Sequence, residues 1–215
     1  MTVRIKICGL REAAGWDAAV DSRADWLGLN FFPRSPRFLT PAEAGRLAAR
    51  GTGGAGLVGL FVAPFEDDAV RAVLDAVPLA ALQVYGPVAG LRERFGVPIW
   101  QAIGVETAAD LPHAAPGADH LLVEAKPPRG ATRPGGNATS FDWPILSGWA
   151  SPLCWTLGGG LTPGNVADAI RISGAAAVDV SSGVERAPGL KDPALIRAFA
   201  DAARSVDHPP PGPSV

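Results

Sequence analysis

Two stretches near the carboxyl end decide how this chain folds: Gly158-Gly159-Gly160-Leu161-Thr162-Pro163-Gly164-Asn165-Val166 and Val178-Asp179-Val180-Ser181-Ser182-Gly183-Val184-Glu185. Each follows or contains an apolar run, ends in small residues, and precedes a predicted helix start, at Thr162-Pro163 and at Asp192-Pro193. Glycine turns and helix N-termini present unpaired N–H donors to an anion. Either turn alone is more typical of a tight loop. Two in tandem predict the phosphate site that follows strands seven and eight of a (β/α)₈ barrel.

The length of the chain fits one such barrel. At 215 residues it is long enough for a large core and too short for a second full domain. With 47% hydrophobic and 19% charged residues it has the composition of a globular protein. We therefore expect a single domain over residues 1–205 and a disordered Pro-rich tail over residues 206–215.

Charge and hydropathy exclude several classes of partner. The formal net charge of -2 offers no basic stripe for nucleic acid or an anionic membrane, although a small anionic ligand needs only a few donors. No apolar run is long enough to cross a bilayer. Two cysteines and no charged-then-apolar leader suggest a reduced, cytoplasmic setting. We expect a monomer or a homodimer that binds a small anionic ligand.

Short apolar runs alternate with amphipathic or Ala-rich stretches along the whole chain, which predicts a parallel sheet covered by helices. A doubly wound open sheet is the alternative, and the strand count together with the paired turns favours closure. The sixth strand–helix unit has the weakest sequence pattern, because a Pro/Gly-rich loop over 126–139 precedes a short predicted helix. The predicted strands are 3–8, 26–31, 56–61, 81–84, 98–103, 120–124, 153–157 and 177–180, and the predicted helices are 13–20, 41–49, 65–76, 88–95, 108–113, 142–146, 163–172 and 193–203.

In a barrel of this kind, chemistry lies where the strands end and the following loops begin. The polar residues at these positions are Cys8, Asn30, Arg34, Arg37, Gln83, Tyr85, Glu124, Asp179 and Ser181.

Cys8 is the candidate base. Lys6 lies two residues earlier on the same face of the predicted strand and would favour a thiolate. A small buried hydrophobe is the alternative for a cysteine at a strand end. Cys154, at the start of the seventh strand, is expected in the core. No metal site is expected, because the cysteines and the histidines show no ligand spacing; the histidines are His113, His120 and His208.

Glu124 is the candidate acid, because it ends an apolar strand and burial beside a pocket would raise its pKa. An ion pair with Lys126 is the alternative. Arg37 would offer a bidentate fork to a substrate carboxylate, or else be solvated surface. Asp179 would either orient a ligand hydroxyl or stiffen its own loop.

These residues carry a family resemblance that runs in order from Lys6 to Asp192. The chain resembles the phosphoribosylanthranilate isomerase family of tryptophan biosynthesis. The motifs are Lys6-Ile7-Cys8-Gly9-Leu10, Phe32-Pro33-Arg34-Ser35-Pro36-Arg37, Leu82-Gln83, Phe141-Asp142-Trp143, Gly159-Gly160-Leu161 with Asn165-Val166, and Asp179-Val180-Ser181-Ser182-Gly183-Val184-Glu185 followed by Pro188-Gly189 and Lys191-Asp192.

The resemblance implies a cofactor-free (β/α)₈ enzyme that isomerises N-(5-phosphoribosyl)anthranilate by an Amadori rearrangement. It makes Cys8 the general base, a carboxyl group at Glu124 the general acid, and Arg37 the clamp on the anthranilate carboxylate. The remaining residues implied in substrate binding are Lys6, Gln83, Asp179, Gly159, Gly160, Ser181, Ser182 and Gly183.

Two positions depart from the family pattern. The family usually carries aspartate where Glu124 stands, and histidine in Leu-Gln-Leu-His-Gly where Tyr85 stands. Glutamate keeps the carboxyl but moves it outward by about one bond length, and a misplacement of that order can cost about 10²-fold in rate. Two other functions therefore stay open: isomerisation of another phosphorylated aminoaldose, and a catalytically silent phosphosugar-binding barrel.

Overall fold

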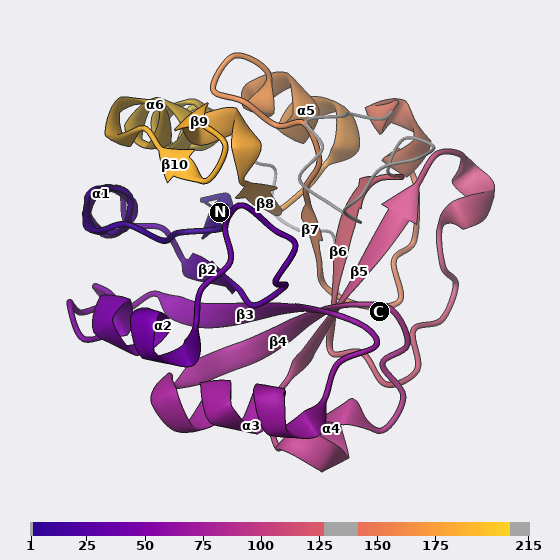
Figure 1. The fold of residues 1–215 in the computed structure, drawn as a ribbon. Coiled ribbons are helices and arrows are strands. Elements are labelled where there is room, and N and C mark those ends of the chain that lie inside the picture. Colours follow the sequence, from indigo (N-terminus) through magenta and orange to yellow (C-terminus); the bar gives the residue numbers. More distant parts are fainter. Residues whose placement is uncertain (1, 127–141, 207–215) are drawn as a thin grey trace.

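The computed structural model describes residues 2–126 and 142–206 of the chain. Eight parallel strands hydrogen-bond in sequence order and close into a barrel, with β1 paired to β8. Figure 1 shows the helices around the outside of this barrel. The predicted (β/α)₈ fold is thereby confirmed. Its strands are β1 (Arg4–Cys8), β2 (Trp26–Asn30), β3 (Gly56–Val62), β4 (Leu79–Tyr85), β5 (Ile99–Val105), β6 (His120–Ala125), β7 (Trp155–Leu157) and β8 (Ala177–Val180).

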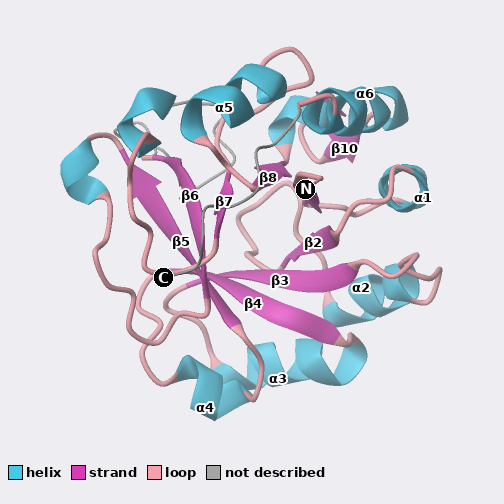
Figure 2. Ribbon diagram, turned by 180° about the vertical axis from the view of Figure 1, so that it is seen from behind, coloured by secondary structure: helices cyan, strands magenta, loops and turns pink. Residues whose placement is uncertain are grey.

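Helices, drawn in cyan in Figure 2, surround the barrel. The described residues also form short 3₁₀ turns. Amphipathic patterning and local caps define the longer helices. Thr40 and Glu43 form a reciprocal capping box at the start of α2, and Asp192 accepts from two backbone N–H groups at the start of α6. The elements are α1 (Ala13–Asp21), α2 (Pro41–Ala48), α3 (Asp67–Ala76), α4 (Leu91–Phe95), η1 (Ala108–Asp110), η2 (Trp143–Leu146), α5 (Val166–Ser173), η3 (Ser182–Val184) and α6 (Pro193–Arg204).

Two predicted helices are wrong in type. The stretches after β5 and β6 form only the 3₁₀ turns η1 and η2. Pro112 follows η1 closely and cannot donate the backbone hydrogen bond that a longer helix needs. Gly148, just after η2, has a positive φ of 76° that ends the helical backbone there.

The two helix starts predicted beside the glycine and serine turns have different outcomes. The start at Asp192-Pro193 is confirmed, but a short hairpin of β9 (Glu185–Ala187) and β10 (Leu190–Lys191) separates it from the serine turn. The start at Thr162-Pro163 is wrong, because α5 begins at Val166. Asn165 instead folds back on the preceding loop: its Oδ1 accepts from Thr162 N at 2.7 Å and its Nδ2 donates to Gly160 O at 3.0 Å.

Alternation along the strands sets which side chains point into the barrel. On β1, the register places Lys6 beside Asp179 of β8, and the two side chains meet inside the barrel. On β6, His120 and Glu124 lie four residues apart and therefore on the same face, at opposite ends of the strand. The barrel interior thus carries polar groups at both ends.

Four further expectations concern individual residues and segments of the chain. Cys154 is exposed, so its prediction as a core residue is wrong: β7 begins only at Trp155, and Cys154 belongs to the preceding loop. The predicted tail over 206–215 and the predicted loop over 126–139 lie almost entirely outside the described residues. Within the described ranges, no helix is long and apolar enough to cross a membrane.

Candidate active site

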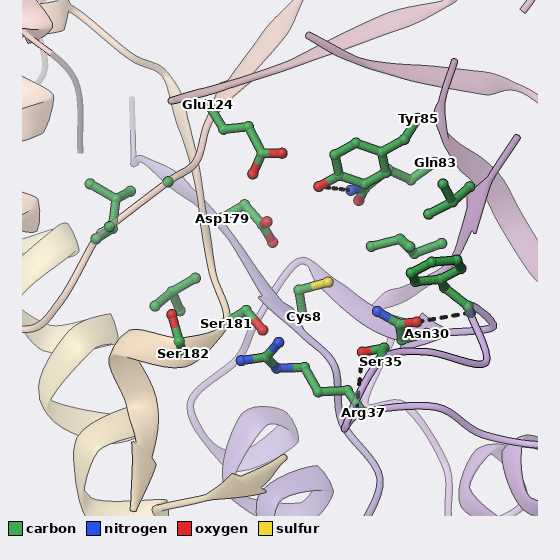
Figure 3. Close-up of a pocket in the computed structure, with 17 residues that line it drawn as sticks. Cys8, Asn30, Ser35, Arg37, Gln83, Tyr85, Glu124, Asp179, Ser181 and Ser182 are labelled. Atoms are coloured by element: carbon green, nitrogen blue, oxygen red, sulfur yellow. Dashed lines mark hydrogen bonds between the residues drawn. The ribbon is translucent and has the colours of Figure 1, made fainter. Parts of the chain in front are cut away.

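One pocket opens at the carboxyl ends of the barrel strands (Figure 3). Its polar wall comes from six strands or the loops that follow them, namely those of β1, β2, β4, β6, β7 and β8. The lining residues are Cys8, Asn30, Phe32, Ser35, Arg37, Leu60, Val62, Gln83, Tyr85, Glu124, Gly159, Gly160, Leu161, Asp179, Val180, Ser181 and Ser182.

A buried ion pair forms the floor of the pocket. Lys6 Nζ donates to Asp179 Oδ1 at 2.8 Å, and the Lys6 side chain is fully buried. Burial alone would lower the pKa of Lys6, but the charges of Asp179 and Cys8 outweigh this effect and raise it. Lys6 therefore remains a fixed cation beneath the pocket. It does not line the pocket itself.

Cys8 lies at the end of β1 with its thiol in the pocket, and Figure 3 shows the sulfur pointing toward the same space as Asp179 and Glu124. Gly28 on β2 leaves room for it, since a Cβ there would lie 2.9 Å from Cys8 Sγ. Burial raises the pKa of Cys8 above its ordinary 9.0, although Lys6 acts in the opposite direction. Lys6 thus favours the thiolate, as predicted, but desolvation of the charged form outweighs it and the net pKa of Cys8 rises.

Glu124 is buried at the end of β6, and one of its carboxylate oxygens, Oε1, has no hydrogen-bond partner among the described residues. Burial raises its pKa to about 8, which is the direction predicted from its position. The alternative pairing with Lys126 is wrong: Lys126 Nζ binds Asp110 Oδ1 at 2.6 Å, outside the pocket. The raised pKa favours the neutral, protonated form of Glu124 near pH 7.

Tyr85 and Gln83 lie beside Glu124. Gln83 Nε2 donates to the Tyr85 hydroxyl at 3.3 Å, and Figure 3 shows that hydroxyl facing Glu124. Gln83 Oε1 is buried without a partner among the described residues. Burial, followed by the charge of Glu124, raises the pKa of Tyr85 well above its ordinary 10.0. Tyr85 is therefore a neutral hydrogen-bonding group and no base near pH 7.

The glycine turn after β7 and the serine turn of η3 lie on one side of the pocket. Gly159 and Gly160 both have positive φ, at 83° and 65°, a conformation that other residues rarely adopt. Gly183 does not line the pocket but supports the turn from behind, because a Cβ at this position would overlap the carbonyl of Leu161. Ser181 and Ser182 line the pocket. Exposed backbone N–H groups at such turns suit a phosphate.

Arg37 is buried and lines the pocket, so the alternative of a solvated surface residue is wrong; Arg34, in the same loop, is exposed. The Arg37 guanidinium forms a bidentate pair with Glu185, with Nε to Oε1 at 2.7 Å and Nη2 to Oε2 at 2.9 Å. Glu185 belongs to a motif of the family resemblance, but its pairing with Arg37 is not predicted from that motif. The sequence contains no signal of this contact, because the two residues are 148 positions apart.

The structure therefore brings together nine of the eleven residues predicted for the site, and Lys6 and Gly183 lie directly behind its wall. Sequence reasoning missed Ser35 and Phe32 as lining residues and the buried contacts of Lys191. Among the described residues, no group of three or more His, Cys, Asp or Glu side chains is arranged to hold a metal ion.

The fold and the pocket define a class: a (β/α)₈-barrel enzyme whose ionisable side chains converge at the carboxyl ends of the strands. Comparison with known proteins narrows this class. Residues 5–202 match the family model described as N-(5'phosphoribosyl)anthranilate (PRA) isomerase. The chain belongs to the phosphoribosylanthranilate isomerase family, and it is an isomerase of tryptophan biosynthesis.

Curated relatives and solved structures agree with this assignment. The N-(5'-phosphoribosyl)anthranilate isomerase of Acidiphilium cryptum is 54% identical over 206 residues, covering 94% of this chain and 99% of the relative. That of Paramagnetospirillum magneticum is 51% identical over 212 residues, covering 95% and 98%.

A phosphoribosyl anthranilate isomerase crystallised with reduced 1-(o-carboxyphenylamino)-1-deoxyribulose 5-phosphate is 30% identical with a TM-score of 0.80, covering 95% of this chain and 100% of that one. Monomers generated from the dimeric Thermotoga maritima enzyme are 32% identical with a TM-score of 0.79, at the same coverage.

Proposed function

We propose that this chain converts N-(5-phosphoribosyl)anthranilate to 1-(2-carboxyphenylamino)-1-deoxyribulose 5-phosphate by an Amadori rearrangement, with Glu124 as general acid and Cys8 as general base. The observation that carries the proposal is their convergence: a carboxyl that is neutral at pH 7 and a thiol come from β6 and β1 into one pocket. The arrangement supplies a proton donor and a proton acceptor to one bound sugar.

Glu124 is suited to the first step. A proton from its carboxyl moves to the furanose ring oxygen, the bond from that oxygen to C1 breaks, and the nitrogen lone pair forms the iminium. A carboxyl group with a pKa of about 8 carries this proton at physiological pH. Its unpaired Oε1 is a buried polar atom that a substrate group would satisfy. The extra methylene, relative to aspartate, moves this carboxyl farther into the pocket.

Cys8 is suited to the second step. Its thiolate takes the proton from sugar C2, the electron pair moves toward the iminium nitrogen, and an enolamine forms that relaxes to the ketone. The iminium itself is the electron sink, so this step needs no added cofactor. The raised pKa of Cys8 makes its thiolate scarce but strongly basic.

The two ends of the substrate match the two sides of the pocket. The glycine and serine turns suit the 5-phosphate, and Arg37 suits the anthranilate carboxylate. Binding energy from both ends would hold C1 and C2 between Glu124 and Cys8. Asp179, paired with Lys6, faces the same space and would accept from a sugar hydroxyl.

The proposal fixes the pH dependence. Catalysis needs protonated Glu124 and ionised Cys8, and their pKa values are about 8 and above 9.0. Below pH 8 activity rises with pH, because the thiolate fraction of Cys8 grows. Above the Cys8 pKa activity falls, because the thiolate is complete and the protonated fraction of Glu124 keeps decreasing. We expect a bell-shaped kcat/KM profile with its maximum above pH 8, measured with the purified enzyme; a maximum below pH 7 would contradict the assignment.

Complementation tests the function itself. An auxotroph that lacks phosphoribosylanthranilate isomerase should grow without tryptophan when it expresses this chain. The Cys8→Ala chain, expressed to the same level, should not restore growth. Failure of the unchanged chain, with retained binding of the reduced product analogue, would favour a silent phosphosugar-binding barrel.

A further inference from the structure

We propose that Glu185 and Lys191, both outside the pocket wall, form a buried positioning unit that orients Arg37 and ties it to the serine turn. This inference rests on the proposed function, because there Arg37 binds the substrate carboxylate and the serine turn binds the phosphate. The unit would let one rigid segment fix both ends of the substrate at a set separation. Glu185 and Lys191 are positioning residues, since neither lines the pocket.

The contacts form a continuous chain of hydrogen bonds. Glu185 binds the Nε and Nη2 edge of the Arg37 guanidinium with both carboxylate oxygens, at 2.7 and 2.9 Å. Lys191 Nζ donates to Glu185 Oε1 at 2.9 Å and to the carbonyl of Ser181 at 2.9 Å. Lys191 therefore links the carboxylate that holds the arginine to the first residue of the serine turn.

Burial makes this geometry rigid. The side chains of Arg37 and Glu185 are each 5% exposed and that of Lys191 is fully buried. Water competes little for these groups, so the charge-assisted bonds hold a single arrangement. A guanidinium has five N–H donors, and Glu185 uses two of them on one edge. The opposite Nη1 edge is left for an anion in the pocket.

Charge within the unit favours an anionic ligand. Arg37 and Lys191 are two cations that share the one carboxylate of Glu185. The trio thus carries one positive charge in excess, next to the pocket that Arg37 lines. A substrate carboxylate would complete the neutralisation of a buried cluster, which is a favourable arrangement in a low-dielectric site.

Three glycines make room for the unit. A Cβ on Gly9 would overlap Arg37 Cδ, and a Cβ on Gly15 would lie 2.8 Å from the Cβ of Lys191. A Cβ on Gly189, in the hairpin turn, would overlap the carbonyl of Pro36. The Gly189 contact brings the β9–β10 hairpin directly against the Arg37 loop, and the other two contacts pack Arg37 and Lys191 against the loop after β1 and against α1. Because η3, β9 and β10 are consecutive, the serine turn is joined directly to this hairpin.

The test compares two substrates in the full-length enzyme: the phosphoribosyl anthranilate and the analogue that lacks the ring carboxylate. In wild type, kcat/KM should favour the carboxylated substrate. In Glu185→Gln that preference should fall by about tenfold or more, because the amide no longer holds the fork in place. The matched control is Asp17→Asn, which removes the partner of an exposed bidentate arginine, Arg50, and should leave the preference unchanged.

A double-mutant cycle separates positioning from general destabilisation. If Glu185 acts through Arg37, Glu185→Gln should have little further effect on the preference once Arg37→Met is present. Should Glu185→Gln fail to fold, Glu185→Asp keeps the charge, shortens the reach, and should reduce the preference in the same direction. An unchanged preference in a folded Glu185 variant, or additive effects in the cycle, overturns this inference alone. No turnover of either substrate by the wild-type chain overturns the proposed function and this inference with it.

Discussion

His120 and Glu124 lie on the same face of β6, at opposite ends of the barrel, and both are buried. At the amino end, His120 Nε2 hydrogen-bonds Thr156 Oγ1 at 2.8 Å, and its ring lies 4.2 Å from that of Trp100, centroid to centroid. At the carboxyl end, Glu124 Oε1 has no such partner among the described residues and faces a pocket. Burial of a polar group therefore does not by itself mark a functional residue, whereas an unsatisfied atom beside a pocket supports such a role.

Burial shifts the pKa values of these two residues in opposite directions. Burial lowers the pKa of His120 to about 4, with Arg4 and Lys6 acting the same way, and it raises that of Glu124 to about 8. Both shifts favour the neutral form. The neutral imidazole is a packed, hydrogen-bonded core group. The neutral carboxyl keeps a proton that it can donate.

The largest effect on turnover is expected at the carboxyl end of the barrel, where the pocket lies. It is tested by comparing variants of the two cysteines. Cys8→Ala should lower kcat by about 10³-fold or more with KM nearly unchanged, because proton abstraction acts only in the transition state. The exposed Cys154, just before the amino end of β7, gives the control: Cys154→Ala should match wild type. Steady-state kinetics of both variants checks this prediction. If Cys8→Ala kept its activity, Cys8 would not be the general base.

The next effect is on substrate binding at the serine turn. Gly183→Ala should raise KM by about 10-fold or more, because its Cβ would overlap the Leu161 carbonyl and displace the turn. Gly164→Ala is the control, since its Cβ would meet only Thr162 Oγ1 at 3.8 Å. The dephosphorylated substrate should be insensitive to Gly183→Ala. An equal rise in KM for both substrates would speak against phosphate binding at this turn.

The smallest effect on turnover is expected at the amino end. His120→Gln should leave kcat within about twofold of wild type but change the pH dependence of stability. The folded pKa of about 4 lies below the ordinary 6.5, so wild type loses stability as pH falls from 6.5 through 4. The total loss is on the order of 3 kcal/mol. The free energy of unfolding, measured in urea across this pH range, should fall with decreasing pH in wild type and fall less in His120→Gln. A large drop in kcat in His120→Gln would contradict the proposed difference between His120 and Glu124.

Strand order, barrel closure and the positions of Cys8 and Glu124 could be predicted from the sequence, because strand ends and turns are local patterns. The helix types after β5 and β6 could not be predicted, because the residues of a single 3₁₀ turn also fit the pattern of a short α-helix.

The failures at the site have a common physical cause. The partners of Arg37 and Lys126 depend on which distant residues the fold brings within a few ångströms, and single-chain spacing does not encode them. The net pKa of Cys8 is not predictable from the sequence for a related reason. Lys6 is visible in the sequence as a neighbour on the same face, but the degree of burial that outweighs its charge is set by the whole barrel.

Stability and single-turnover rate of Glu124→Gln, measured together at pH 8, test the central claim most directly. Because burial raises the folded pKa of Glu124 from 4.5 to about 8, wild type loses stability as pH rises from 4.5 through 8. An amide cannot ionise, so Glu124→Gln should be more stable than wild type at pH 8, by on the order of 1–3 kcal/mol. It should also turn over at least about 10²-fold more slowly, with Glu124→Asp much milder. A Glu124→Gln protein that is less stable yet fully active would contradict the account.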